Sequence, residues 1–224
     1  ALTEAQRYPR DYDGIIAGSL ANRHIHMWTA GVERSIDLSR HPEKAITAEQ
    51  ATLVNDLVTK SCDTLKEGFL NNPHACKVDF SALKCQAGAT ENSCLTDAQM
   101  KTVETYYGGV KNSKGELIFS GQALGNPITA QRPTNQAPGG LFDLVRIAHN
   151  DPKVDWHSFD LDREMKFLDE KIGYVDAVNP DLSKFKASGG KLLITHGWSD
   201  TGITPENSVW YYESILHKMG QSQS

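Results

Sequence analysis

The chain has 224 residues, of which 39% are hydrophobic and 23% charged, and its formal net charge is −5. This composition is typical of a globular protein of one or two domains, and it excludes a disordered or fibrous chain. The sequence has no run of 18 apolar residues and no clustered stripe of lysine and arginine. We therefore expect no membrane span and no binding to nucleic acid or an acidic membrane surface, and the expected partner is a small or neutral molecule.

The N-terminal region predicts one helix followed by one strand. Residues 1–8 have the pattern of a helix stopped by Pro9, and residues 12–19 that of a buried strand with its turn. The first six residues are too polar for a signal peptide and lack an initiator methionine, which suggests a fragment or a processed chain. His24 and His26 would share one face of a strand, as metal ligands sometimes do. Because no third ligand is signalled nearby, a structural or lid-hinge role is favoured.

From about residue 31, polar helical segments alternate with loops. A helix is predicted over residues 47–60, because Thr47 is a suitable N-cap and Gln50 follows three residues later. Residues 108–140 are rich in glycine, proline and asparagine, and within them only residues 116–119 resemble a strand. The spacing of apolar residues predicts a further helix over residues 160–172.

The four cysteines, Cys62, Cys76, Cys85 and Cys94, all lie in one short central region. An even, clustered set is typical of two disulfides; three connectivities are possible, and pairing neighbours in sequence closes the shortest loops. Zinc is the alternative, but no C-x-x-C pair occurs and His74 is the only histidine within the cluster. Two disulfides would imply an oxidising compartment.

The most informative segment is residues 189–200. Residues 191–195 form a short apolar and β-branched run between a glycine pair and a turn, as in a strand buried in a parallel sheet. Asp200 follows the carboxyl end of this strand, where open α/β sheets keep their chemistry, and Thr204 is a plausible N-cap of the next helix. Asp200 is therefore a candidate partner for a catalytic histidine. His196 precedes it by only four residues, and we expect it to satisfy a loop hydrogen bond rather than to act as the base.

The predicted elements give an α/β fold made of core, long insertion and core. The strands at residues 15–17 and 192–195 are expected to be neighbours in one sheet. Residues 1–30 and 181–224 would form the two parts of the core, and residues 31–180 a disulfide-bearing lid inserted between them.

A catalytic serine is not evident. A serine hydrolase needs a nucleophile on a sharp G-x-S-x-G turn and a histidine base, and the pair Gly18 and Ser19 lacks the second glycine and the following helix. His149 and His157 have neighbours typical of surface residues. The four aspartates within residues 151–162 are compatible with a bound cation, but a solvated loop and helix N-terminus explain them more simply.

Five segments carry a specific pattern: EAQRYP at residues 4–9, YDGIIAG at 12–18, CLTDAQ at 94–99, FDLDR at 159–163 and GGKLLITHGWSD at 189–200. Together they resemble the tannase and feruloyl esterase family, and the resemblance covers essentially the whole chain. Members of that family are secreted or periplasmic α/β-hydrolases with a large lid. The resemblance therefore implies a partial α/β-hydrolase core with a large inserted, disulfide-bearing lid, and a serine-type carboxylic ester hydrolase.

The family resemblance gives Asp200 the part of the aspartate in a serine, aspartate and histidine triad. The family's serine, in a G-C-S-x-G-G-R setting, would lie a few residues before Ala1, and its histidine, in a glycine-histidine-cysteine setting, beyond Ser224. The chain would then be an internal fragment with one triad member of three, and we expect it to have no ester turnover by itself. Its cysteines would be those of the lid, and catalysis would require no cofactor.

The family also binds calcium in its lid through a C-D-x-x-D-G-x-x-D-G-x-[IL] loop, whose oxygen ligands suit a hard cation. The matching segment here is residues 62–70, which is shorter by three residues and contains Lys66. Asp63 and Glu67 remain as candidate ligands of a structural calcium ion.

The implied substrate is a small aromatic ester, with a galloyl, feruloyl or related acyl group. One alternative is a non-catalytic module that binds aromatic or sugar ligands; another is a different esterase on the same fold, such as one for terephthalate half-esters. Trp28, Phe142, Trp156 and the pair Tyr106 and Tyr107 are candidates for an aromatic-acid pocket in the lid, although ordinary core packing is favoured for each.

Overall fold

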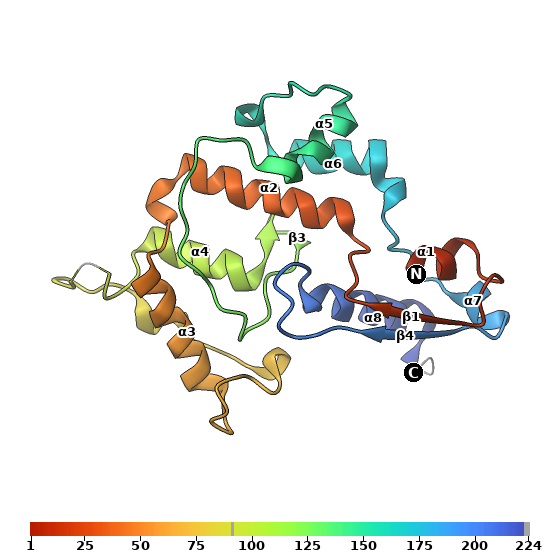
Figure 1. Ribbon diagram of the computed structural model, residues 1–224, viewed down its shortest axis with the longest axis horizontal. Coiled ribbons are helices and arrows are strands. Elements are labelled where there is room, and N and C mark those ends of the chain that lie inside the picture. Colours follow the sequence, from red (N-terminus) through yellow and green to blue (C-terminus); the bar gives the residue numbers. More distant parts are fainter. Residues whose placement is uncertain (91, 222–224) are drawn as a thin grey trace.

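The computed structural model describes residues 1–90 and 92–221 (Figure 1). It shows a mixed α/β fold, and among these residues no helix is long and apolar enough to cross a membrane. The α-helices are α1 (Leu2–Arg7), α2 (His24–Arg40), α3 (Ala48–Cys62), α4 (Asp97–Gly108), α5 (Asp143–His149), α6 (Leu161–Ile172), α7 (Ser183–Ala187) and α8 (Pro205–Met219). The strands are β1 (Gly14–Gly18), β2 (Val110–Lys111), β3 (Leu117–Phe119) and β4 (Lys191–Thr195).

The two strands expected to be neighbours do pair, although more than 170 residues separate them. β1 and β4 run parallel, with Ile16 opposite Leu193 and Gly18 opposite Thr195. Their carboxyl ends therefore meet at the same edge, beside the loop that leads into α8 (Figure 1). The expected strand near residues 116–119 is β3, which pairs with β2 in a separate antiparallel hairpin.

The expectation that both parallel strands are buried is wrong. In β1, Ile15 and Ala17 are buried, whereas Ile16 between them is 74% exposed; Leu193, the partner of Ile16, is 56% exposed. Side chains alternate between the faces of a strand, and only one face is covered, by apolar residues of α1, α7 and α8. The apolar run in the sequence is continuous, but among the described residues nothing covers the second face.

The buried apolar residues form three clusters. The sheet core contains Ile15 and Ala17 of β1 with residues of α1, α7 and α8. The helical core joins α2, the β2–β3 hairpin, α5 and α6, and it includes Ile25, Phe142 and Leu168. The third cluster lies beside the disulfide-bearing loops and combines residues of α3 and α4 with Ile46, Leu95 and Ile128.

Local signals placed four of the eight α-helices of the described residues, namely α1, α3, α6 and α8. The predicted helix at residues 47–60 is α3, and its capping box is complete: Thr47 accepts from the Gln50 N–H while the Gln50 side chain accepts from the Thr47 N–H. The helix predicted at 160–172 is α6, capped by Asp160. The strand interpretation of His24 and His26 is wrong, because α2 begins at His24 and residues two apart on a helix point in different directions.

The expected division of the chain at residue 30 falls inside α2, whose buried residues belong to the helical core. The other expected division, at residue 180, falls between Ala177 and Leu182, which both belong to the sheet core. The division into core and lid therefore stays a prediction, and we use the word lid below for residues 31–180.

Candidate active site around Asp200

Asp200 lies in the loop between β4 and α8, just beyond the carboxyl ends of both parallel strands. Its carboxylate oxygen Oδ1 accepts hydrogen bonds from the main-chain N–H groups of Gly202 and Ile203, each at 2.9 Å. The N–H of Ile203, that of Gly202 and the Ser19 hydroxyl hold the pKa of Asp200 below its ordinary value, because all three bind the ionised form. The aspartate is therefore an anion near neutral pH with one oxygen already fixed.

Ser19 follows β1 directly and contributes to this site in a way that the sequence did not indicate. Its backbone is in the left-handed region, with φ 46°, and its N–H donates to the carbonyl of Thr195 at the end of β4. This conformation places its hydroxyl on Asp200. A nucleophilic serine would instead bind a histidine, so Ser19 has the contact expected of a residue that supports the aspartate.

His196 is fully engaged within the same loop, as expected. Its Nε2 lies 2.9 Å from the carbonyl oxygen of Ile203, and its Nδ1 lies 2.6 Å from the hydroxyl oxygen of Ser208. A carbonyl can only accept, so Nε2 donates to Ile203, while Nδ1 is paired with the Ser208 hydroxyl. The Nε2 is also 3.4 Å from Oδ2 of Asp200, and the side chain is 5% exposed. Neither nitrogen of His196 is free to take a proton from a nucleophile.

The second oxygen of Asp200, Oδ2, accepts no main-chain N–H of the described residues and lies 3.4 Å from Nε2 of His196. The Asp200 side chain is 27% exposed, while Oδ1 is occupied by the main chain. A fixed, ionised carboxylate with one accessible oxygen can accept an N–H from an incoming imidazole, hold that ring in one tautomer and stabilise its protonated form. This is the chemistry of the orienting acid in a catalytic triad.

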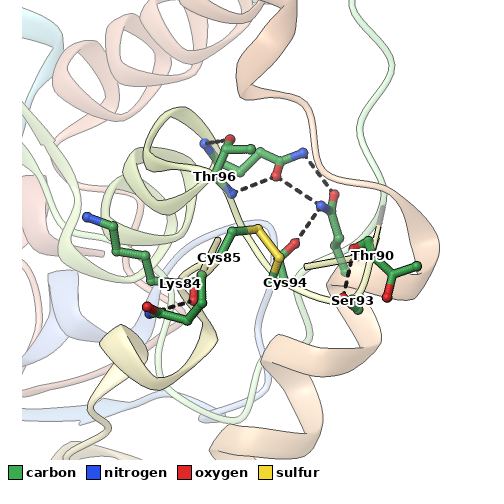
Figure 2. The surroundings of a disulfide bond; sticks show 9 residues. Lys84, Cys85, Thr90, Ser93, Cys94 and Thr96 are labelled. Carbon is green, nitrogen blue, oxygen red and sulfur yellow. Dashed lines mark hydrogen bonds between the residues drawn. A yellow bond between two sulfur atoms is a disulfide. The ribbon is translucent and has the colours of Figure 1, made fainter. Parts of the chain in front are cut away.

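The four cysteines form two disulfides, Cys62–Cys76 and Cys85–Cys94, which is the pairing that closes the shortest loops. Figure 2 shows the second one beside Thr96, the residue that caps α4. The side chain of Gln50, in α3, donates to the carbonyl of Cys94 at 2.8 Å and so ties this loop to the third cluster.

The loop closed by the first disulfide contacts the segment that carries Asp200. His74, in a short 3₁₀ turn two residues before Cys76, has its ring 6.1 Å from that of Trp198 in a stacked arrangement. Its Nδ1 also lies 3.2 Å from a carboxylate oxygen of Glu206 in the first turn of α8. The disulfide-bearing region is therefore in direct contact with the loop after β4.

The candidate calcium ligands, Asp63 and Glu67, lie on a separate loop after α3. Both oxygens of Asp63 accept main-chain N–H groups, from Glu67 and Gly68, and the Glu67 carboxylate accepts from Asn71. Calcium takes six to eight oxygen ligands, and in the described part of the chain no group of three or more acidic, histidine or cysteine residues is placed to hold a metal ion. These two residues fit calcium poorly as they stand, and calcium binding here remains a prediction.

Three further histidines, His26, His149 and His157, bind neighbouring side chains or main chain. His26 lies 3.3 Å from Asp169, and its Nδ1 is 3.1 Å from the carbonyl oxygen of Ile118. His157 is exposed and lies 2.8 Å from Asp155. His149 is exposed, as its neighbours suggested, and its Nε2 lies 2.8 Å from the buried carboxylate of Glu164.

Two of the four aspartates within residues 151–162 cap helices, and all four bind neighbouring N–H groups, as expected of a loop and a helix N-terminus. Asp160 accepts from the N–H of Arg163 at the start of α6, and Asp155 from that of His157. Asp162 binds Ser113 through both the N–H and the hydroxyl.

The aromatic residues considered for a substrate pocket serve mainly to pack α2 and the lid. Phe142 is fully buried in the helical core, and Trp156 packs against the same cluster. Trp28 packs its ring on that of His24, 4.8 Å away. The hydroxyls of Tyr106 and Tyr107 donate to the carbonyls of Pro127 and Asn126, and burial raises the pKa of Tyr107.

The sequence matches the family described as "Tannase and feruloyl esterase" over residues 1–224. It is 27% identical to a probable feruloyl esterase B-2 of Aspergillus terreus, over 96% of this chain and 42% of the relative. It is 28% identical to an uncharacterized esterase of Xanthomonas campestris, again over 96% of this chain and 42% of the relative.

Solved structures also match this chain over nearly its whole length. The crystal structure of feruloyl esterase B from Aspergillus oryzae matches with a TM-score of 0.83 and 26% identity, over 97% of this chain and 46% of that one. Tannin acyl hydrolase from Aspergillus niger shares the fold, with a TM-score of 0.68 at 17% identity, over 45% of its chain. The chain thus spans less than half the length of the relatives it matches, and it belongs to the tannase and feruloyl esterase family.

Proposed function

We propose that this chain supplies the orienting aspartate, Asp200, of a serine-type carboxylic ester hydrolase. The observation that carries the proposal is the divided carboxylate: Oδ1 is held by the N–H groups of Gly202 and Ile203, while Oδ2 accepts no main-chain N–H of the described residues and the side chain is 27% exposed. The serine and the histidine would come from chain segments outside residues 1–224. The β1–β4 pair would be part of an α/β-hydrolase core, in which functional groups collect at the carboxyl ends of the strands.

In this mechanism the aspartate acts only through the histidine. Oδ2 accepts one imidazole N–H, which leaves the other ring nitrogen unprotonated and directed at the serine hydroxyl. The histidine takes the serine proton as the serine oxygen attacks the ester carbonyl, and it then gives the proton to the leaving alcohol. Water attacks the acyl-serine by the same route and releases the acid. The negative charge of Asp200 stabilises the imidazolium in both steps.

The proposed substrates are esters of aromatic acids. Feruloyl esterases are prominent among the matched relatives, and the family resemblance implies galloyl, feruloyl or related acyl groups. The two disulfides fit an oxidising compartment, so we also propose that the protein is secreted or periplasmic. A terephthalate half-ester is an alternative substrate for the same site.

The test compares Asp200→Asn with the unchanged protein in the longer chain that provides the serine and the histidine. Asparagine keeps the shape of the side chain but removes the charge and favours the wrong histidine tautomer, so kcat for a chromogenic aryl ester should fall about 10⁴-fold. Asp181→Asn is the matched control, because Asp181 also accepts a main-chain N–H at 3.0 Å but lies beside α7.

Two results would contradict the proposal. Unchanged turnover in Asp200→Asn would remove the triad role and favour the alternative, a module that binds aromatic or sugar ligands without catalysis. Burst release of the chromophore by the 224-residue chain alone, abolished in Asp200→Asn, would show that this chain needs no serine or histidine from elsewhere.

A further inference from the structure

We infer that two lid residues, Gln122 and Asn126, are positioning residues for Asp200. Nδ2 of Asn126 donates to the main-chain oxygen of Asp200 at 3.3 Å, and Nε2 of Gln122 donates to that of Thr201 at 3.1 Å. These partners are 74 and 79 positions apart in the sequence. The inference rests on the proposed function, because that function requires the direction of the Asp200 carboxylate to be fixed.

The segment of residues 121–126 is held on its lid side by the end of α4. The N–H of Gln122 donates to the carbonyl of Tyr106 at 2.7 Å, and the hydroxyl of Tyr107 donates to the carbonyl of Asn126 at 3.1 Å. Gly121 packs so closely against α4 that an added Cβ would lie 2.3 Å from the carbonyl oxygen of Tyr107. Only glycine fits there, and the segment is a firmly anchored part of the lid.

Asn126 is a buried polar residue, and the hydrogen bonds that its amide donates account for its presence there. The residue is 1% exposed, and its amide nitrogen donates both to Oε1 of Gln122, at 3.0 Å, and to the carbonyl of Asp200. Its Oδ1 is buried with no hydrogen-bond partner, which is unfavourable. An apolar residue would avoid that penalty, so the two hydrogen bonds that the amide donates, to Gln122 and to the Asp200 carbonyl, are the feature that requires an asparagine.

A third hydrogen bond joins the same two segments in the opposite direction. Thr204 is the N-cap residue of α8, but its side chain makes no capping bond; its hydroxyl donates to the carbonyl of Gly121 at 2.5 Å. The turn is therefore tied to the lid at residues 200, 201 and 204. The two N–H groups that bind Oδ1, from Gly202 and Ile203, lie between residues 201 and 204, which are both hydrogen-bonded to the lid. The lid thus fixes the direction in which Oδ2 faces.

The first test examines Asp200 in the 224-residue chain, where no catalysis is needed. Asn126→Ala and the uncharged, similarly sized Gln122→Met each remove one donor to the turn. We expect amide hydrogen exchange at Gly202 and Ile203 to become about five- to tenfold faster, the factor for one lost hydrogen bond. The pKa of Asp200, followed by NMR of its carboxyl carbon, should rise toward its ordinary value because the N–H groups bind the anion less firmly.

Asn55→Ala is the matched control. Asn55 is also a lid amide, and it exchanges two hydrogen bonds with the main chain of Ile128, at 2.9 and 3.0 Å. Unchanged exchange and an unchanged titration of Asp200 in both test variants would overturn the inference. An equal change in Asn55→Ala would also overturn it, because general loosening of the lid would then be sufficient. Should Asn126→Ala fail to fold, the variant Gln122→Met, at a partly buried position, decides the outcome.

The second test uses the longer, active protein. Asn126→Ala should lower kcat about five- to tenfold and leave KM unchanged, since the turn orients the histidine and does not bind substrate. A loss of turnover in Asp200→Asn with unchanged kcat in Asn126→Ala would overturn the positioning role alone. Unchanged turnover in Asp200→Asn would contradict the proposed function instead, so the two failures are distinguishable.

Discussion

The helical core and the parallel strand pair differ sharply in how completely they are covered. In the helical core, Ile25, Ile36, Phe142 and Leu168 are all 0% exposed. In the strand pair, one face is covered by α1, α7 and α8, while Ile16 and Leu193 stand side by side on the other face, 74% and 56% exposed. Parallel sheets normally have both faces covered. The helical part of this chain therefore has a complete core of its own, and the strand pair does not.

The lid and the strand pair therefore differ in what they contribute to the molecule. The lid holds packed clusters and both disulfides, whereas the strand pair provides the edge at which Asp200 sits. The lid is also bound to that edge, through Gln122 and Asn126 and through the contact of His74 with Trp198. We therefore expect mutations in the lid core to act on folding and mutations on the open face of the strands to have little effect.

The largest expected effect follows from removing a fully buried side chain of the helical core. Leu168→Ala should lower the free energy of unfolding by about 2–5 kcal/mol, because it leaves a cavity at a 0% exposed site. The matched variant Leu193→Ala, on the exposed face of β4, should change it by less than about 0.5 kcal/mol. Urea unfolding of the 224-residue chain measures both. Similar values for the two variants would remove the contrast between the regions.

Loss of the first disulfide should have the next largest effect. The Cys62–Cys76 bond closes a loop with a sequence separation of 14, so Cys62→Ser with Cys76→Ser should cost about 3 kcal/mol. The Cys85–Cys94 loop, with a separation of 9, should give a slightly smaller loss. Urea midpoints with and without reductant provide the comparison. A midpoint that does not respond to reductant would show that the lid clusters hold these loops unaided.

The helix caps should matter less than the core or the disulfides. Thr96→Ala breaks the capping box with Gln99 at the start of α4 and should cost about 1 kcal/mol. Thr52→Ala is the control, since Thr52 lies within α3 and donates to the carbonyl of Ala48 in the preceding turn. Thermal unfolding followed by circular dichroism distinguishes them. A larger loss in Thr52→Ala than in Thr96→Ala would contradict this role of the cap.

The smallest expected effect concerns pH and the Asp200 turn. The pKa of Asp200 is lower in the folded chain than its ordinary value of 3.8, because main-chain N–H groups bind the anion. Its contribution to stability is therefore fully present above that value and is lost as the pH falls through the lower, folded pKa. Asp200→Asn should flatten the loss of stability in acid, measured by urea unfolding from about pH 6 to pH 3. Asp56→Asn, on the exposed face of α3, is the control, and an equal flattening there would contradict the assignment.

Sequence patterns predicted the elements whose signals are local. The capping box of Thr47 and Gln50, the apolar spacing of α6 and the run at residues 191–195 each involve residues within a few positions of one another, and each prediction is confirmed. The pairing of β1 with β4 is confirmed as well. The strand interpretation at His24 was wrong because the residues that decide it, the partners of α2 in the helical core, are far away in sequence.

The candidate site also combines features that local sequence predicted with features that only the tertiary structure decided. The place of Asp200 after a strand, and the internal hydrogen bonds of His196, are consequences of short-range order that the sequence determined. The contact of Ser19 with Asp200, the hydrogen bonds from Gln122 and Asn126, and the open face at Ile16 and Leu193 were decided only by the tertiary structure. A hydrogen bond across 74 positions leaves no local pattern, because it depends on where two separately folded segments come to lie.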